Sequence, residues 1–254
     1  PGLEGIVAAQ TRLSSVDGQA GELIIAGFRV EELAGNASFE ETVYLLWHDE
    51  LPNAGQLAAF RQELAAQREL PQATLDLLRA AATKKEPVMD ALRMATGTLS
   101  LEATTISTIA EAQRDAIILV AKFPAIVAAY KRLLHGQEPL VPRADLGHAA
   151  NFLYMLYGDM ALYELAREVE RTAVKLLAEY KPDRKLQTNV EFYTALLLHG
   201  LGLETGLFTP TFAIGRVAGW TAHCLEQLGD NRLFRPQSAY TGVKNRHWVP
   251  VEER

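Results

Sequence analysis

The side chain best suited to substrate chemistry is Arg216, in the segment FAIGRVAGW, where Gly215 and Gly219 lie four residues apart on one helical face. A helix-borne guanidinium flanked by glycines suits two-point capture of a carboxylate. The glycines also allow another helix to approach closely, and ordinary packing within the chain would use them in the same way. Zinc-type cysteine–histidine spacing, a phosphate-binding loop and a dinucleotide glycine fingerprint are missing from the sequence. The sequence therefore favours small anions over metals or nucleotides.

The composition is that of a soluble, helix-rich protein. Hydrophobic residues make up 48% of the chain and charged residues 22%, close to globular averages. A net charge of -6 and a pI near 5.6 disfavour nucleic-acid and membrane partners. The sequence shows neither a spanning apolar run nor a signal peptide. The single Cys224 cannot form an internal disulfide and is expected to be a buried, inert thiol, so we expect a cytoplasmic protein.

The elements that must position Arg216 are mostly helices. The first thirty residues alternate like short strands and turns. Ser38 and Glu41 form the pattern of a helix capping box, and Pro52 is expected to end that helix. Further helices are expected at residues 54–68, 71–82, 87–99, 105–134, 144–157, 159–180, 189–201 and 209–228. The sequence thus predicts a mainly α fold with a short N-terminal β segment.

The longest expected helix, residues 105–134, is apolar around most of its circumference. Pro124 lies inside it and predicts a kink or a break. A helix of this kind is central in a large protein or is buried against a partner subunit. Because the chain is short, we expect the partner to cover residues 114–134.

Several ordered segments resemble those of bacterial-type citrate synthases. They are GLEG, SFEETVYLLWHDELP, AKFPAIVAAYKRL, HAANFLYML, NVEFY, FTPTFAIGRVAGWTAH and DNRLFRP. The resemblance extends over most of the chain and implies the multi-helical, dimer-forming citrate synthase fold. It also implies acetyl-CoA and oxaloacetate as substrates, with no bound cofactor and no metal.

Three family segments have no counterpart in this chain: H-A-D-H-E, G-P-L-H-G with its carbonyl-polarising histidine, and G-H-R-V-Y-K. After HAANFLYMLYG the sequence passes from Gly158 directly into DMALYELAREVER. By composition alone this joint is an ordinary helix–helix turn. Compared with the citrate synthase family, the joint implies that residues 1–254 are one large domain and that the small catalytic domain is missing near residues 158–159.

The resemblance assigns roles to four retained residues. Arg216 matches an arginine that binds an oxaloacetate carboxylate, and Arg235, in NRLFRP, matches one that reaches into the partner subunit's site. Arg232 competes with Arg235 but suits a structural salt bridge. His148, in LGHAANF, matches an oxaloacetate-contacting histidine, with a capping or half-buried histidine as the open alternative. Glu191, in NVEFY, stands where the family has the aspartate that removes the methyl proton.

These assignments imply a citrate synthase reduced to its large domain, with little or no synthase activity. A non-catalytic dimeric scaffold or interaction partner is one alternative. An enzyme with residual or altered activity, such as a 2-methylcitrate synthase, is another. In each case we expect a homodimer or larger homo-oligomer, with oxaloacetate or citrate as a weak ligand.

Overall fold

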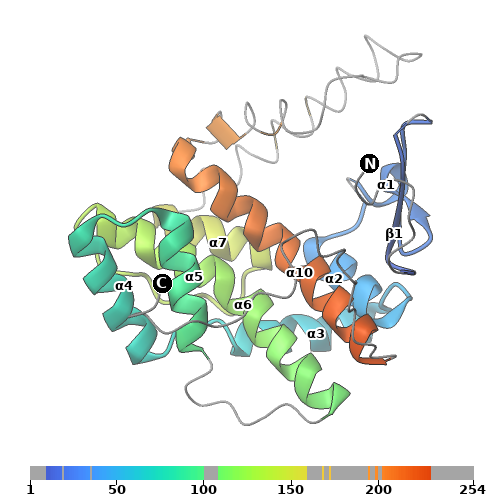
Figure 1. Ribbon diagram of the computed structural model, residues 1–254, viewed down its shortest axis with the longest axis horizontal. Helices are drawn as coiled ribbons and strands as arrows, with labels where there is room; N and C mark the ends of the chain where they lie inside the picture. The colour runs from blue at the N-terminus through green and yellow to red at the C-terminus, as the bar shows by residue number, and fades with distance from the viewer. Residues whose placement is uncertain are drawn as a thin grey trace, which may run out of the picture.

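The computed structural model describes residues 10–18, 20–34, 36–99, 108–158, 168, 172, 194, 198–199 and 202–229. Within them the fold is a group of packed helices with a small sheet at one side (Figure 1). This confirms the predicted mainly α class with a short N-terminal β segment. No described helix is long and apolar enough to cross a membrane.

The small sheet has three antiparallel strands in the order β1 (Ser14–Asp17), β2 (Glu22–Ile25) and β3 (Phe28–Arg29). Its strands are exposed or half-buried, so the sheet contributes little to the core. The short helix α1 (Val30–Leu33) follows. The sheet is instead tied to the helices through Glu226, which accepts hydrogen bonds from the Thr11 hydroxyl and the Arg12 amide, both at 2.8 Å.

Helix α2 (Phe39–His48) begins with the predicted capping box. The Ser38 hydroxyl accepts from the Glu41 amide at 3.3 Å, and the Glu41 carboxylate accepts from the Ser38 amide at 2.8 Å. These bonds fix the direction of the first turn, since both helix-start amides have partners. The helix ends before Pro52, because Asp49 adopts a left-handed conformation with φ 63°.

The next three helices match the predicted ranges to within about two residues. Helix α3 (Ala54–Ala66) has its own capping box between Asn53 and Gln56. Pro71 and Pro87 stand immediately before α4 (Gln72–Lys84) and α5 (Val88–Thr98).

Helix α6 (Ile109–Leu134) is the central helix of the fold. It packs against α3, α4, α5, α7 and α10, and its residues 120–130 are all buried within the single chain. The expectation that a partner subunit covers this helix is therefore wrong, because the chain's own helices do so. The helix continues through Pro124 without a break. The expected residues 105–107 lie outside the described residues.

Helix α7 (His148–Tyr157) begins four residues later than expected, with Gly147 as its N-cap, and ends at Gly158, whose φ is 85°. A turn occupies residues 144–146. A short 3-10 helix, η1 (Thr205–Leu207), leads into α10 (Phe208–Gly229), which crosses α6 and α2 (Figure 1). The expected helices 159–180 and 189–201, and the chain after Gly158 at the suspected joint, lie almost wholly outside the described residues.

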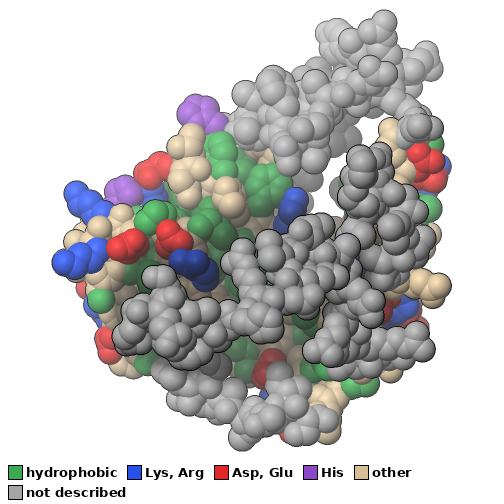
Figure 2. Space-filling view, viewed as in Figure 1, with side chains coloured by type: hydrophobic (Ala, Val, Ile, Leu, Met, Phe, Trp, Pro, Cys, Tyr) green, Lys and Arg blue, Asp and Glu red, His purple; other side chains and the backbone are tan. Residues whose placement is uncertain are grey.

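The surface shows how the charged side chains are distributed and where the single cysteine lies. On the face seen in Figure 2, the described basic and acidic side chains are interspersed, so no single-sign field stands out there. Cys224 is exposed on α10, which corrects the expectation of a buried thiol. Its place on the outer side of an amphipathic helix explains the difference.

Candidate functional site

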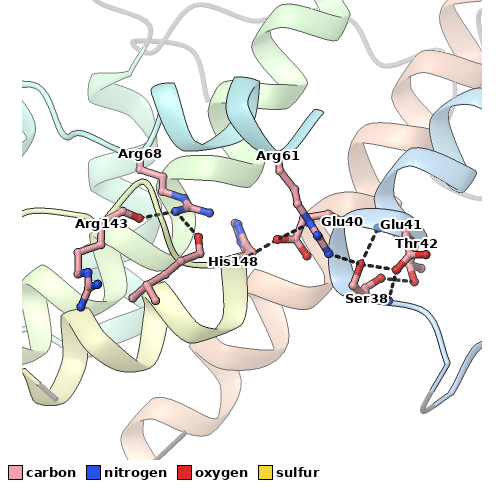
Figure 3. A network of polar contacts seen from close by, with 9 residues as sticks. Ser38, Glu40, Glu41, Thr42, Arg61, Arg68, Arg143 and His148 are labelled. Atoms are coloured by element: carbon pink, nitrogen blue, oxygen red, sulfur yellow. Dashed lines mark hydrogen bonds and ion pairs between the residues drawn. The ribbon is translucent and has the colours of Figure 1, made fainter. Parts of the chain in front are cut away.

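The first residue of α7, His148, is held by a side chain from another helix. Its backbone N–H donates to the Glu40 Oε1 atom at 2.9 Å, and both residues are buried (Figure 3). Gly147 has no side chain that could cap this helix start. The Glu40 carboxylate takes over that task, and its negative charge suits the positive end of the helix dipole.

The His148 ring is stacked on the Phe39 ring, with centroids 4.5 Å apart and planes at 13°. Both ring nitrogens are screened from solvent and have no hydrogen-bond partner among the described residues. Burial, and secondly the charge of Arg68, lowers the pKa of His148 to about 3. The imidazole is therefore neutral near pH 7, with one N–H to donate and one lone pair to accept.

The buried Arg68 holds the turn that precedes α7. Its Nη1 atom donates to the carbonyl oxygens of Arg143 at 2.7 Å and Leu146 at 2.9 Å (Figure 3). Burial lowers the pKa of Arg68, and the nearby Glu40 charge partly opposes that change. We call Phe39, Glu40, Arg68 and His148 the α2–α7 junction.

Arg216 lies on α10, outside the α2–α7 junction. It is exposed on α10, and it makes no hydrogen bond or ion pair in the described part of the chain. A Cβ atom added at Gly215 or Gly219 would meet no atom within 4 Å, so the described helices do not pack closely there. Trp220, one turn beyond Arg216, is 50% exposed. We call Gly215, Arg216, Gly219 and Trp220 the outer face of α10.

The structure thus places two of the four predicted site residues and shows no contact between them. Glu191, Arg235 and the competitor Arg232 lie outside the described residues. His148 is the first residue of α7, but its ring does not cap the helix and is fully buried rather than half-buried; among the described residues its ring nitrogens have no hydrogen-bond partner. Sequence reasoning missed Phe39, Glu40 and Arg68, because their partners are far away in the chain and no local spacing marks them.

The two candidate residues that the structure describes, His148 and Arg216, can both act as hydrogen-bond donors. A neutral imidazole and a free guanidinium can both bind carboxylate oxygens. No group of three or more metal-ligating side chains occurs among the described residues. A hollow of about 280 Å³ between α2, α3 and α6 is lined by Trp47 and Phe60, among others, and shares no lining residue with the junction.

Comparisons with known proteins identify the family. The family model described as "Citrate synthase, C-terminal domain" matches residues 2–161 and 157–237. The chain is 31% identical to a citrate synthase of Haloferax volcanii, over 100% of this chain and 98% of that protein. It is 28% identical to a 2-methylcitrate synthase of Shewanella oneidensis, over 100% and 97%.

Comparison with solved structures identifies the same family. The structure matches citrate synthase from Pyrobaculum aerophilum with a TM-score of 0.82 and 25% identity, over 100% of this chain and 95% of the other. With the family model matching nearly the whole sequence, the chain belongs to the citrate synthase family.

Proposed function

We propose that this chain is a citrate synthase reduced to its large domain, which retains one wall of an oxaloacetate site and has little or no synthase activity. The observation that carries the proposal is the buried neutral ring of His148 with two unused nitrogens. Buried polar atoms without partners cost free energy, and a ligand carboxylate would supply the missing partner for one of the His148 nitrogens.

Two features of the comparisons support a missing small domain. The alignment with the Haloferax protein spans 372 positions, whereas this chain has 254 residues. The family model matches in two segments that meet at residues 157–161, at the suspected joint. Residues 1–254 then correspond to the large domain, in a cytoplasmic protein.

The proposed roles follow the chemistry of the reaction. A carboxylate base removes a methyl proton from acetyl-CoA, the resulting carbanion adds to the ketone carbon of oxaloacetate, and water then cleaves the thioester. Arg216 and Arg235 would bind the carboxylates of oxaloacetate, and the His148 imidazole would donate a hydrogen bond. Both His148 nitrogens are screened from solvent, so binding requires a local opening.

Low activity follows from the altered base and from the missing second domain. Glu191 is one methylene longer than the family's aspartate, which displaces the carboxylate by roughly 1 Å, and a misplacement of that size can cost about a hundredfold in rate. Without the second domain, water is not excluded and electrostatic stabilisation is weak.

Calorimetry with oxaloacetate tests the binding site. We expect weak binding by the natural chain and none by Arg216→Ala. Arg93→Ala is the matched control, because Arg93 is also exposed but lies on α5, where it pairs with Asp90. Equal binding of oxaloacetate by Arg216→Ala and Arg93→Ala would show that Arg216 is not part of the binding site.

A thiol-release assay tests the chemistry. With oxaloacetate and either acetyl-CoA or propionyl-CoA, we expect turnover far below that of a complete synthase run beside it. Turnover near that of the complete enzyme would overturn the reduced-domain proposal. A marked preference for propionyl-CoA would favour the 2-methylcitrate alternative.

The outer face of α10 favours a second candidate, a non-catalytic homodimer. Its glycines are open and Trp220 is half-exposed, which suits contact with another copy or a related subunit. Light scattering at micromolar concentration should give twice the chain mass, falling in Gly219→Glu. A monodisperse monomer would contradict this candidate.

A further inference from the structure

Two consecutive residues of α2 hold His148 from two directions. Phe39 stacks on its ring, and the Glu40 carboxylate accepts its backbone N–H. Phe39 and Glu40 are the first two residues of α2, and the Ser38–Glu41 capping box fixes that turn. The position of the imidazole is therefore set by a helix that is 108 residues away in the sequence.

The charges around Glu40 allow a buried carboxylate to remain in this place. The Arg61 Nε atom lies 3.9 Å from Glu40 Oε1, and the Arg61 Nη2 atom donates to the Ser38 hydroxyl at 3.3 Å. Figure 3 shows the Glu40 carboxylate between Arg61 and His148, with Arg68 on the other side of the histidine. Glu40 can thus serve as a fixed acceptor instead of turning toward solvent.

If Glu40 served only to cap α7, this would explain the hydrogen bond to the His148 amide. It would not explain why the residue at this position is a histidine. The helix start needs only an acceptor for an amide, and any residue could follow Gly147. At this position the sequence has an imidazole that is buried, stacked and without a partner at either nitrogen. A buried donor without a partner costs about 1–3 kcal/mol, which a core residue such as leucine would avoid.

We propose that Phe39 and Glu40 are positioning residues that fix the His148 imidazole, whose two nitrogens have no partner among the described residues, for a carboxylate of a small dicarboxylic acid. The ligand part of this inference rests on the proposed function. The positioning part does not, because it concerns the ring in the free protein.

Nuclear magnetic resonance of ring-labelled histidine tests the positioning directly, with His148→Phe assigning the resonance. At pH 6 we expect an unprotonated His148 in the natural chain. In Glu40→Ala and Phe39→Leu the ring loses one of its contacts and becomes accessible to water. Roughly half or more of the His148 side chains should then be protonated at that pH. Glu40→Gln keeps an acceptor for the backbone amide and should behave like the natural chain.

A matched control separates positioning from loss of stability. Thr108→Ala removes the capping box of α6, which is of the same type but does not touch His148. Like Glu40→Ala it should lower the melting temperature, but it should leave the His148 resonance unchanged. If Glu40→Ala fails to fold, Phe39→Leu and Glu40→Gln still decide the question.

Affinity for oxaloacetate provides the second readout. We expect about tenfold weaker binding in Glu40→Ala and less than about threefold in Glu40→Gln and Thr108→Ala. If the natural chain does not bind oxaloacetate, the proposed function fails while the resonance experiment still decides the positioning. Unchanged His148 resonances in Glu40→Ala and Phe39→Leu, or equal changes in Glu40→Ala and Glu40→Gln, would overturn the proposal.

Discussion

The α2–α7 junction and the outer face of α10 both carry arginine, but they use it in opposite ways. At the junction, Arg68 is 2% exposed and donates to two carbonyl oxygens of the chain. On α10, Arg216 is exposed and makes no bond to any described residue. A buried arginine is tied to stability through its own partners, whereas an exposed free arginine is available to a ligand. The same residue type thus supports the scaffold in one place and can bind substrate in the other.

Replacing the buried arginine should have the largest effect on stability. Arg68→Met leaves two carbonyl oxygens without their donor and removes the positive charge near the buried Glu40. We expect a loss of about 3 kcal/mol in the free energy of unfolding, measured with urea. Arg79→Met, which breaks the exposed ion pairs with Asp76 and Glu138, should cost less than about 0.5 kcal/mol. A loss below 1 kcal/mol for Arg68→Met would contradict the view that the buried arginine stabilises the fold more than an exposed one does.

The pH dependence of unfolding should give the next largest effect. Burial depresses the pKa of His148 from 6.5 to about 3, so between these values the unfolded chain binds more protons than the folded chain. The stability from this residue is complete above pH 6.5 and is lost as the pH falls toward 3.

We therefore expect the natural chain to lose about 2 kcal/mol more than His148→Phe between pH 7 and pH 4.5. Denaturant titrations at both pH values measure the difference, and carboxylates that titrate in both proteins cancel. His48→Gln is the control, because His48 is exposed on α2. A parallel loss in the natural chain and His148→Phe would show that the buried ring is not held neutral.

The capping box of α2 should give a smaller effect that sharpens the comparison. Ser38→Ala removes the acceptor for the Glu41 amide and should cost about 1 kcal/mol. Ser38 and Glu41 bond to each other, so Ser38→Ala and Glu41→Ala should be less than additive in the double variant. Full additivity, measured by thermal unfolding, would mean that the two bonds act separately.

The outer face of α10 should give the smallest effect. Arg216→Ala removes no described contact, so the free energy of unfolding should change by less than about 0.5 kcal/mol. Chemical denaturation at low protein concentration measures this. A loss above 1.5 kcal/mol would show that Arg216 is part of the scaffold after all, like Arg68.

Local signals in the sequence predicted the local structure well. The capping box at Ser38 and the ranges of α3, α4 and α5 depend on neighbours a few residues away, so short-range rules find them. The start of α7 was misplaced, because Arg68 holds the preceding turn from another helix. The apolar surface of α6 predicts a partner subunit, because the sequence alone does not show how many helices of the same chain surround it.

The candidate site was less predictable for the same reason. His148 and Arg216 were found through the family resemblance. Glu40 was not, since nothing near it in the sequence marks a residue that caps a helix 108 positions later. Long-range contacts of this kind become visible only once the helices are placed.

The hydrogen bonds between the two ends of the described chain also determine when, during synthesis, the fold can be completed. The Arg12 amide bonds to Glu226, which lies 214 residues later. At synthesis rates of about 5–20 residues per second, roughly 10–40 s separate the appearance of these two residues. During that interval the β segment has no α10 on which to dock. Its first residues are therefore among the last to be secured, and they remain open to proteases and chaperones while the ribosome is still at work.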